Sequence, residues 1–206
     1  MNLYSNDFSE GQAIPGAFAF AVIDNPIALS SNHNPHLAWS DTPNGTKSLA
    51  LIVIDPDVPS VGDDVNTVGK SVAAQLPRVD FCHWALANIP AHLAEIEAGS
   101  FSSGISARGK PSAGLFNTIQ GLNDYTGWFA NDAEMSGQYH GFDGPCPPWN
   151  DERMHHYIFT LYALDVAHIE LPEHFTHQQL LAAIAQHTLA TASLTGRYTL
   201  NPSVNY

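Results

Sequence analysis

Proline and glycine interrupt this chain along its whole length, and their spacing constrains the fold more than any other feature. Fourteen prolines and fifteen glycines are spread over 206 residues, with short apolar segments between them. Both residue types are common in turns and disfavoured inside long helices. The pattern therefore favours a mainly β protein, in which loops connect short strands, over a helical bundle.

The expected strands are four apolar segments, at residues 17–23, 48–54, 81–89 and 156–164. Segment 48–54 is apolar at odd and even positions, which is typical of a central strand covered on both faces. In the last segment, strand alternation places His155, Tyr157 and Phe159 on one face and His156 on the other. We therefore expect His155 and Tyr157 to point into one site.

One amphipathic helix is expected near the end of the chain. Thr176 and Gln179 fit a capping box, and the apolar residues that follow share one helical face. Gly196 is a plausible signal for the end of this helix. A shorter helical turn is expected around residues 91–98.

Two stretches are expected to be long loops, at about residues 60–78 and 99–147. They are rich in Gly, Asp, Asn, Ser and Pro and show little periodicity. Loops of this length in a compact domain are usually functional or mobile. No break in composition marks a second domain, so residues 1–206 are expected to form a single domain.

The charge balance restricts the partners of this chain. Seven Lys and Arg residues stand against twenty Asp and Glu residues, giving a formal net charge of -13. A negative field repels phosphate backbones and anionic lipid surfaces, so we expect no nucleic-acid partner. No apolar run is long enough to be a transmembrane segment.

Two cysteines, Cys82 and Cys146, are too few for a disulfide framework, although one bridge stays open as an alternative. The first residues show neither the basic region nor the apolar region of a signal peptide. The simplest expectation is a cytoplasmic protein with reduced thiols. Strand alternation also predicts that Cys82 faces away from His83.

Three clusters carry residues that could bind a ligand. Asp55-Pro56-Asp57-Val58-Pro59 follows a buried strand, and its carboxylates could serve a site or only cap a turn. His83 lies within an apolar strand, where a histidine more often satisfies a core hydrogen bond than binds a ligand. The loop Gly144-Pro145-Cys146-Pro147-Pro148 precedes His155, whose neighbour Tyr157 could donate to an oxyanion.

Two histidine pairs have the spacing of metal ligands but lack a third ligand nearby in sequence. They are His33 with His36 and His174 with His177. A structural or catalytic metal needs three or four ligands. We therefore expect surface histidines there and no metal.

Together and in this order, the segments DPDVP, HW, GPCPP and HHY resemble the phosphatidylethanolamine-binding protein (PEBP) family, in its prokaryotic Raf-kinase-inhibitor-like branch. The resemblance begins near residues 14–15, includes residues 34–40 and 43–49, and fades over the last forty residues. It implies a PEBP-like fold, in which a large central β-sheet packs on a smaller sheet with a few peripheral helices.

The resemblance also implies a pocket for phosphate- or carboxylate-bearing ligands, including a phosphoethanolamine head group, with no cofactor. Matching motif positions makes Asp55 the pocket carboxylate, His83 and His155 the imidazoles and Tyr157 part of the wall. It places three residues on the rim: Pro59, Cys146 and Pro148. Asp55 could accept a hydrogen bond from a histidine, or from the ammonium of a zwitterionic head group.

The chain departs from the family pattern at the pocket mouth. Residues 60–78 and 126–141 look longer than in the common prokaryotic pattern, and His156 stands where the family often has Arg. These changes alter the pocket mouth and any partner surface.

Three functions remain open. The first is a binding protein that modulates a partner, as family members that inhibit kinases or proteases do. The second is a small-substrate hydrolase with Asp55, His83 and His155 as acid–base groups, although no activated nucleophile is visible. The third is a structural homodimer whose pocket is a relic.

Overall fold

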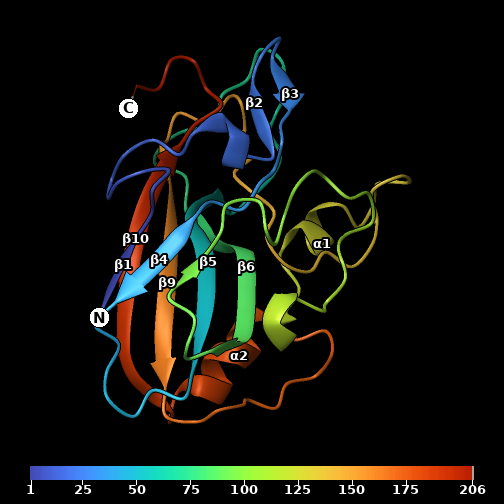
Figure 1. Cartoon of the computed structure of the whole chain (residues 1–206). Coiled ribbons are helices and arrows are strands. Elements are labelled where there is room, and N and C mark those ends of the chain that lie inside the picture. Colours follow the sequence, from blue (N-terminus) through green and yellow to red (C-terminus); the bar gives the residue numbers. More distant parts are fainter. Residues whose placement is uncertain (206) are drawn as a thin grey trace.

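The computed structural model describes residues 1–205 and is mainly β (Figure 1). The largest sheet is antiparallel, with the strand order β10-β9-β5-β6-β8. Its strands are β5 (Ser48–Pro59), β6 (Arg78–Pro90), β8 (Ile119–Gln120), β9 (His155–Leu164) and β10 (Thr188–Tyr198).

The smaller elements surround this sheet. A three-stranded sheet has the order β1-β4-β7, and β2 and β3 form a two-stranded hairpin. The strands are β1 (Asn2–Tyr4), β2 (Ala21–Ile23), β3 (Ile27–Leu29), β4 (Leu37–Ser40) and β7 (Glu95–Ile96). The helices are α1 (Tyr125–Trp128) and α2 (His177–Ile184), with 3-10 turns η1 (Gly16–Phe18) and η2 (Leu115–Asn117). The expected fold class is confirmed.

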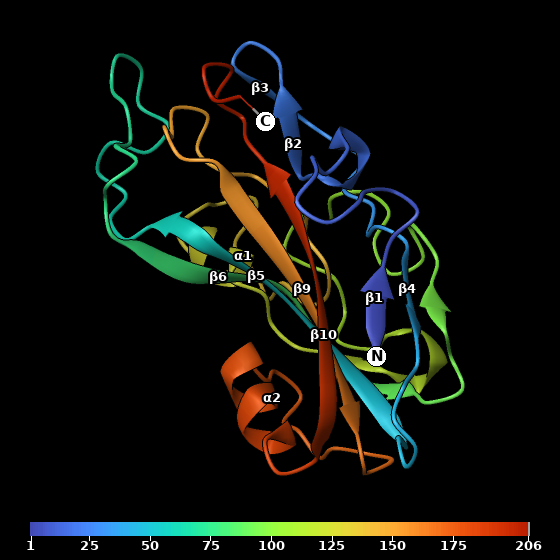
Figure 2. The same ribbon diagram turned by 90° about the vertical axis from the view of Figure 1, so that its left-hand side faces the viewer.

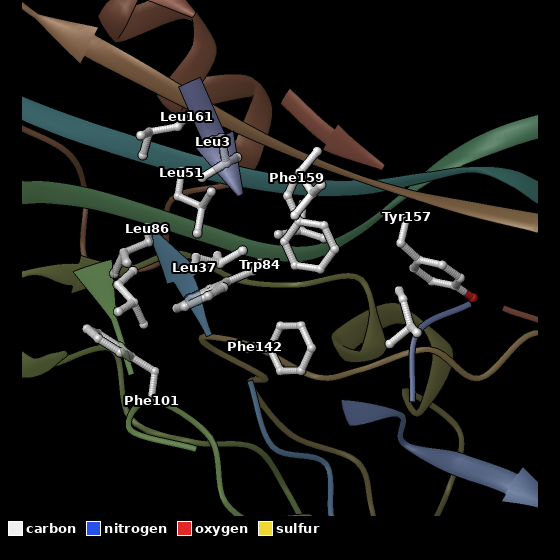
Figure 3. Close-up of a cluster of buried hydrophobic side chains, with 14 of the residues drawn as sticks. Leu3, Leu37, Leu51, Trp84, Leu86, Phe101, Phe142, Tyr157, Phe159 and Leu161 are labelled. Carbon is white, nitrogen blue, oxygen red and sulfur yellow. The ribbon is translucent and has the colours of Figure 1, made fainter. Parts of the chain in front are cut away.

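The large sheet is the middle layer. Figure 2 shows β1 and β4 on one of its faces and α2 on the other. Along β5, Leu49 and Leu51 belong to the hydrophobic core beneath the three-stranded sheet. Figure 3 shows part of this core. Ala50 and Ile52 alternate with them and pack beneath α2. The expectation of a strand covered on both faces is therefore confirmed, and burial of each leucine or isoleucine side chain stabilises the fold by about 1.5–3 kcal/mol.

The expected helix is confirmed at its start but not at its end. Thr176 and Gln179 form the capping box, and α2 begins at His177. The helix ends at Ile184, and Gly196 lies inside β10, so Gly196 was wrongly read as an end signal. Residues 188–198 pair along β9, and this long-range pairing overrides the local turn preference of glycine.

Two local expectations near the chain start and middle were wrong in part. Within 17–23, only residues 21–23 form a strand, because the chain after Pro15 makes a 3-10 turn in which Phe18 N–H donates to Pro15 O. Around 91–98 no helix forms. Glu95 and Ile96 pair instead with β4.

Two histidines expected at the surface are buried. His36 and His177 are each 6% exposed. His36 accepts from the backbone N–H of Asn6 and lies 3.3 Å from Glu95. His177 packs at the buried side of α2, where burial lowers its pKa. Tertiary packing, invisible in the spacing of these residues, decides their exposure.

Most of residues 60–77 and 99–147 is irregular, with η2, β8 and α1 as short elements inside the second stretch. A buried polar cluster anchors this stretch at Asp143. Its carboxylate accepts from Lys110 Nζ (2.5 Å), Asn32 Nδ2 (2.7 Å) and Asn123 Nδ2 (2.9 Å). A buried ion with this many donors holds the loop in one place.

We expect Gly144→Ala to destabilise the protein by about 1–3 kcal/mol, because the space at this position is already filled by backbone. A Cβ on Gly144 would lie 2.1 Å from the carbonyl oxygen of Phe18 and 3.0 Å from the Cα of Ala19. Gly127→Ala is the control, since no atom lies within 4 Å of its added Cβ. Urea unfolding measures both, and equal free energies of unfolding would contradict the expectation.

Candidate functional site

A cavity of about 480 Å³ opens at the end of β5 and the start of β6. Six of the seven site residues predicted from the sequence line it: Asp55, Pro59, His83, Cys146, Pro148 and Tyr157. These residues belong to β5, β6, β9 and the loop around Gly144, where Gly144 packs closely against Phe18 of η1. The sequence prediction therefore brought together residues that are adjacent in space, whereas their roles in binding stay predictions.

A β-bulge directs His83 into the cavity. Val53 pairs with Trp84, whereas the next residue, Ile54, pairs with Cys82, so His83 is the extra residue of β6. Bulges commonly redirect a side chain beside a functional site. Cys82 packs beneath α2 and not in the cavity, so the expectation that it faces away from His83 is confirmed.

The hydrogen bonds of His83 determine which of its nitrogens is protonated. Nδ1 lies 2.7 Å from the carbonyl oxygen of Asp143, which can only accept, so Nδ1 carries a hydrogen and donates it. Burial lowers the pKa of His83, against the weaker opposing effect of the Asp55 carboxylate. The ring is therefore neutral at pH 7, and its Nε2 is a hydrogen-bond acceptor.

Aromatic rings provide the burial of His83. The ring centroids of Phe81, Tyr157 and Tyr125 lie 5.0, 5.1 and 5.7 Å from the imidazole. Such a setting removes water and disfavours the charged imidazolium. At neutral pH, His83 therefore presents an acceptor to the cavity rather than a donor.

His155 lies behind Asp55 and does not line the cavity, contrary to the sequence prediction. It is 0% exposed, with Nδ1 2.6 Å from Asp55 Oδ2 and Nε2 3.1 Å from Asp151 Oδ2. Burial alone would lower the pKa of His155, but hydrogen bonds to these two carboxylates raise it to about 9. Both ring nitrogens donate, so His155 acts on the cavity only through Asp55.

The charges behind the cavity balance one another. Arg78 binds both carboxylate oxygens of Asp151, at 2.5 and 3.0 Å. Asp57 contacts Arg153 Nε at 2.7 Å and His156 Nδ1 at 2.8 Å. The three carboxylates, of Asp55, Asp57 and Asp151, therefore face three cations: Arg78, Arg153 and the imidazolium of His155. Removing one of these charges leaves its partner unpaired.

Sequence reasoning missed Asp151 and Arg78 as members of this site. Asp151 precedes His155 by four residues, and this spacing places two side chains on one face only in a helix. Residues 151–155 do not form a helix. Arg78 was the last residue of the predicted loop 60–78, where a lone arginine is normally exposed, but it begins β6. Only the folded chain brings these residues together.

Tyr157 presents a buried hydroxyl to the cavity. Apart from its interaction with the nearby Asp55 carboxylate, its oxygen makes no hydrogen bond to any residue within the described part of the chain. Figure 3 shows Tyr157 at one end of the apolar cluster, with its hydroxyl pointing outward. Burial and the nearby Asp55 carboxylate raise the pKa of Tyr157 well above its ordinary value, so the hydroxyl keeps its proton. An unpartnered buried hydroxyl is a donor available to a ligand.

The rest of the cavity wall is mainly apolar and aromatic. Burial raises the pKa of the Cys146 thiol to about 12, so it is no thiolate. No Lys or Arg lines the cavity among residues 1–205, and the same residues hold no group of three or more metal-ligating side chains. The apolar and aromatic wall includes Phe20, Ile27, Leu29, Val61, Phe81, Trp128, Phe129 and Met135.

We expect the stability of this protein to fall as the pH rises from about 7 to 9. The folded-state pKa of His155 is raised from 6.5 to about 9, so its stabilisation is complete below pH 6.5 and is lost through about pH 9. The loss is on the order of 2–3 kcal/mol. Thermal unfolding across this range measures it.

The matched control for this pH dependence is His155→Gln, which keeps hydrogen-bonding atoms but cannot titrate. Cys82 and Cys146 also have raised pKa values, so their ionisation in the unfolded chain adds a loss of the same sign above about pH 8.5. That loss remains in the variant. A wild type and a His155→Gln variant with parallel stability curves between about pH 7 and 8.5 would contradict the charge assigned to His155.

Comparisons with known proteins agree with this architecture. A sequence model of the family described as phosphatidylethanolamine-binding protein matches residues 4–199. The chain is 31% identical to the UPF0098 protein YbhB of Escherichia coli, covering 96% of this chain and 99% of the relative. It is 34% identical to a UPF0098 protein of Chlamydia muridarum, covering 96% and 98%.

Solved structures give the same result. The crystal structure of E. coli YbcL, described as a member of the mammalian PEBP family, superposes with a TM-score of 0.69 at 25% identity, covering 96% of this chain and 97% of YbcL. A PEBP homologue from Chlamydia trachomatis superposes with a TM-score of 0.64 at 31% identity, covering 96% and 95%. Within residues 1–205, no helix is long and apolar enough to span a bilayer. The chain therefore belongs to the phosphatidylethanolamine-binding protein family.

Proposed function

We propose that this protein binds a small amphiphilic ligand in the cavity, with a phosphate or carboxylate group at the polar end near Asp55, His83 and Tyr157. A zwitterionic, phosphoethanolamine-like ligand suits the polar end best. The observation that carries the proposal is the buried hydroxyl of Tyr157, which lines the cavity and, beyond its interaction with the Asp55 carboxylate, has no hydrogen-bond partner among the described residues.

The polar end offers two acceptors and one donor. Asp55 and Nε2 of the neutral His83 accept, whereas the Tyr157 hydroxyl donates. A ligand with an ammonium group, or a phosphate that keeps one hydroxyl, supplies hydrogens for the acceptors and an oxygen for the donor. A fully ionised anion faces Asp55 without a neighbouring cation in the wall, which opposes its binding.

The walls set the size and character of the rest of the ligand. A volume of about 480 Å³ is within the range of small-molecule sites. The aromatic rings of Phe20 and Tyr125 stack at 4.8 Å, and Leu29, Val61 and Trp128 extend the apolar surface to the mouth. An apolar body attached to the polar group therefore gains burial.

We expect Tyr157→Phe to weaken O-phosphoethanolamine binding about tenfold, because the ligand loses a hydrogen bond to a charged oxygen, worth about 1.5 kcal/mol or more. The melting temperature is expected to stay level or rise, since the variant removes an unsatisfied buried hydroxyl. Isothermal titration calorimetry and thermal unfolding measure the two effects.

Tyr162→Phe is the matched control, because Tyr162 lies on the same strand with its side chain directed to the core beneath α2. It should leave affinity unchanged. Equal affinities of the wild type and both variants, or no binding of O-phosphoethanolamine by the wild type, would contradict the proposal.

We expect a simple anion such as acetate to bind more tightly as the pH falls from about 8 to 5.5. His83 has a lowered pKa in the free protein, and an anion beside Nε2 favours its protonated form, so binding takes up a proton. NMR titration of the histidine ring signals follows both events. In a His83→Gln variant this pH dependence should vanish. If it persisted there, a group other than His83 would take up the proton.

The hydrolase alternative gains no support from the cavity. Cys146 keeps its proton, and both ring nitrogens of His155 are committed to the carboxylates of Asp55 and Asp151. The cytoplasmic location, a kinase or protease partner and a homodimer stay predictions. The free thiols of Cys82 and Cys146 are compatible with a reducing compartment.

A further inference from the structure

A second concave surface lies at the opposite end of the central strands from the cavity. The cavity takes residues from the end of β5, whereas this groove takes residues beside the start of β5 and the end of β6. Its volume is about 510 Å³, a size that accepts a small molecule. The groove is lined by Lys47, Asn88, Pro90, Ala91, His92, Phe116, Asn117, Ala167 and His168.

The groove differs from the rest of the molecule in charge. Its lining contains Lys47, His92 and His168 but no Asp or Glu, in a chain with seven basic and twenty acidic residues. His168 lies 3.3 Å from Glu170, and both side chains are exposed, so this pair holds the ring only weakly. Lys47 makes no ion pair among the described residues and is free to meet an anion.

An exposed aromatic ring lies in the same groove. Phe116 is 53% exposed and has φ 56°, a left-handed conformation that a bulky residue rarely adopts. Asn117 (φ 61°) and Asn88 (φ 62°) share this conformation. Three of the seven non-glycine residues with positive φ in residues 1–205 therefore line one groove, and such residues gather at functional sites.

Hydrogen bonds hold these residues in place without a ligand. Thr118 N–H donates to Leu115 O at 3.0 Å, and Gly114 N–H donates to Thr118 O at 3.0 Å, which closes the turn around Phe116. Asn88 exchanges two side-chain hydrogen bonds with the backbone of Ile169, at 3.2 and 2.8 Å. The ring of Phe116 is thus presented on a fixed turn.

We propose that this groove binds a small aromatic anion, with its ring on Phe116 and its carboxylate or phosphate on Lys47, His92 and His168. A flat ring stacks on an exposed phenylalanine, and the basic side chains supply donors to the anionic group. An anionic group would meet Lys47 in the groove, whereas in the cavity it would meet the Asp55 carboxylate. The two sites therefore select different ligands. The proposal is independent of the function proposed for the cavity.

The test uses phenyl phosphate and follows the histidine ring signals of the full-length protein by NMR. We expect the signals of His92 and His168, assigned with single His→Gln variants, to shift at millimolar phenyl phosphate. Inorganic phosphate should bind at least fivefold more weakly, because it cannot stack. Shifts confined to His83, or equal binding of the two probes, would overturn the proposal.

Two variants separate binding from folding. Lys47→Met should weaken phenyl phosphate binding at least fivefold and reduce its dependence on salt. Phe116→Asn should weaken binding to a similar extent while the melting temperature stays level or rises, because asparagine tolerates the left-handed conformation. If Phe116 served only to form the turn, the Phe116→Asn variant would change in stability but not in affinity for phenyl phosphate.

The matched controls are Lys70→Met and Leu115→Asn. Lys70 is an exposed lysine near Asp64, away from the groove, and Leu115 is an exposed apolar neighbour of Phe116 outside its lining. Both should bind phenyl phosphate like the wild type. If Lys70→Met weakened binding as much as Lys47→Met, the effect would reflect overall charge, and the groove would be excluded as the site.

Discussion

The imidazolium of His155, held between Asp55 and Asp151, is the interaction on which the site depends. It neutralises the carboxylate at the base of the cavity and links β5, β9 and the loop before β9. Arg78 completes the link by binding Asp151 through two hydrogen bonds. Because these groups are almost fully buried, each charge needs its partner, and the geometry of Asp55 follows from the whole chain of contacts.

The bulge at His83 supplies the second constraint on the cavity. It brings the imidazole beside Tyr157 and Tyr125, where burial keeps the ring neutral. One side of the cavity base therefore carries a compensated carboxylate and the other a neutral acceptor. The remaining wall is apolar, and this combination favours an amphiphilic ligand with hydrogen-bond donors over a bare anion.

The two concave surfaces divide the electrostatics of an acidic protein between the ends of its central strands. The cavity beyond β5 has no Lys or Arg in its wall among residues 1–205 and one histidine, His83, whereas the groove before β5 has Lys47 and two histidines and neither Asp nor Glu. We therefore expect the two sites to differ in the ligands they prefer, with a fully ionised anion favoured only in the groove. The uniform negative field expected from composition does not describe either site.

The sequence by itself determined the fold class, the central strand 48–54 and the start of α2, and it named six of the residues that line the cavity, because periodicity, capping and sequence motifs can be read without the fold. Only the tertiary structure decided that His155 lies behind Asp55 and that Gly196 belongs to a strand. It also decided that His83 is a neutral acceptor and that Asp151 and Arg78 belong to the site. Burial, strand pairing and charge balance depend on contacts between residues far apart in the chain, so no local pattern carries them.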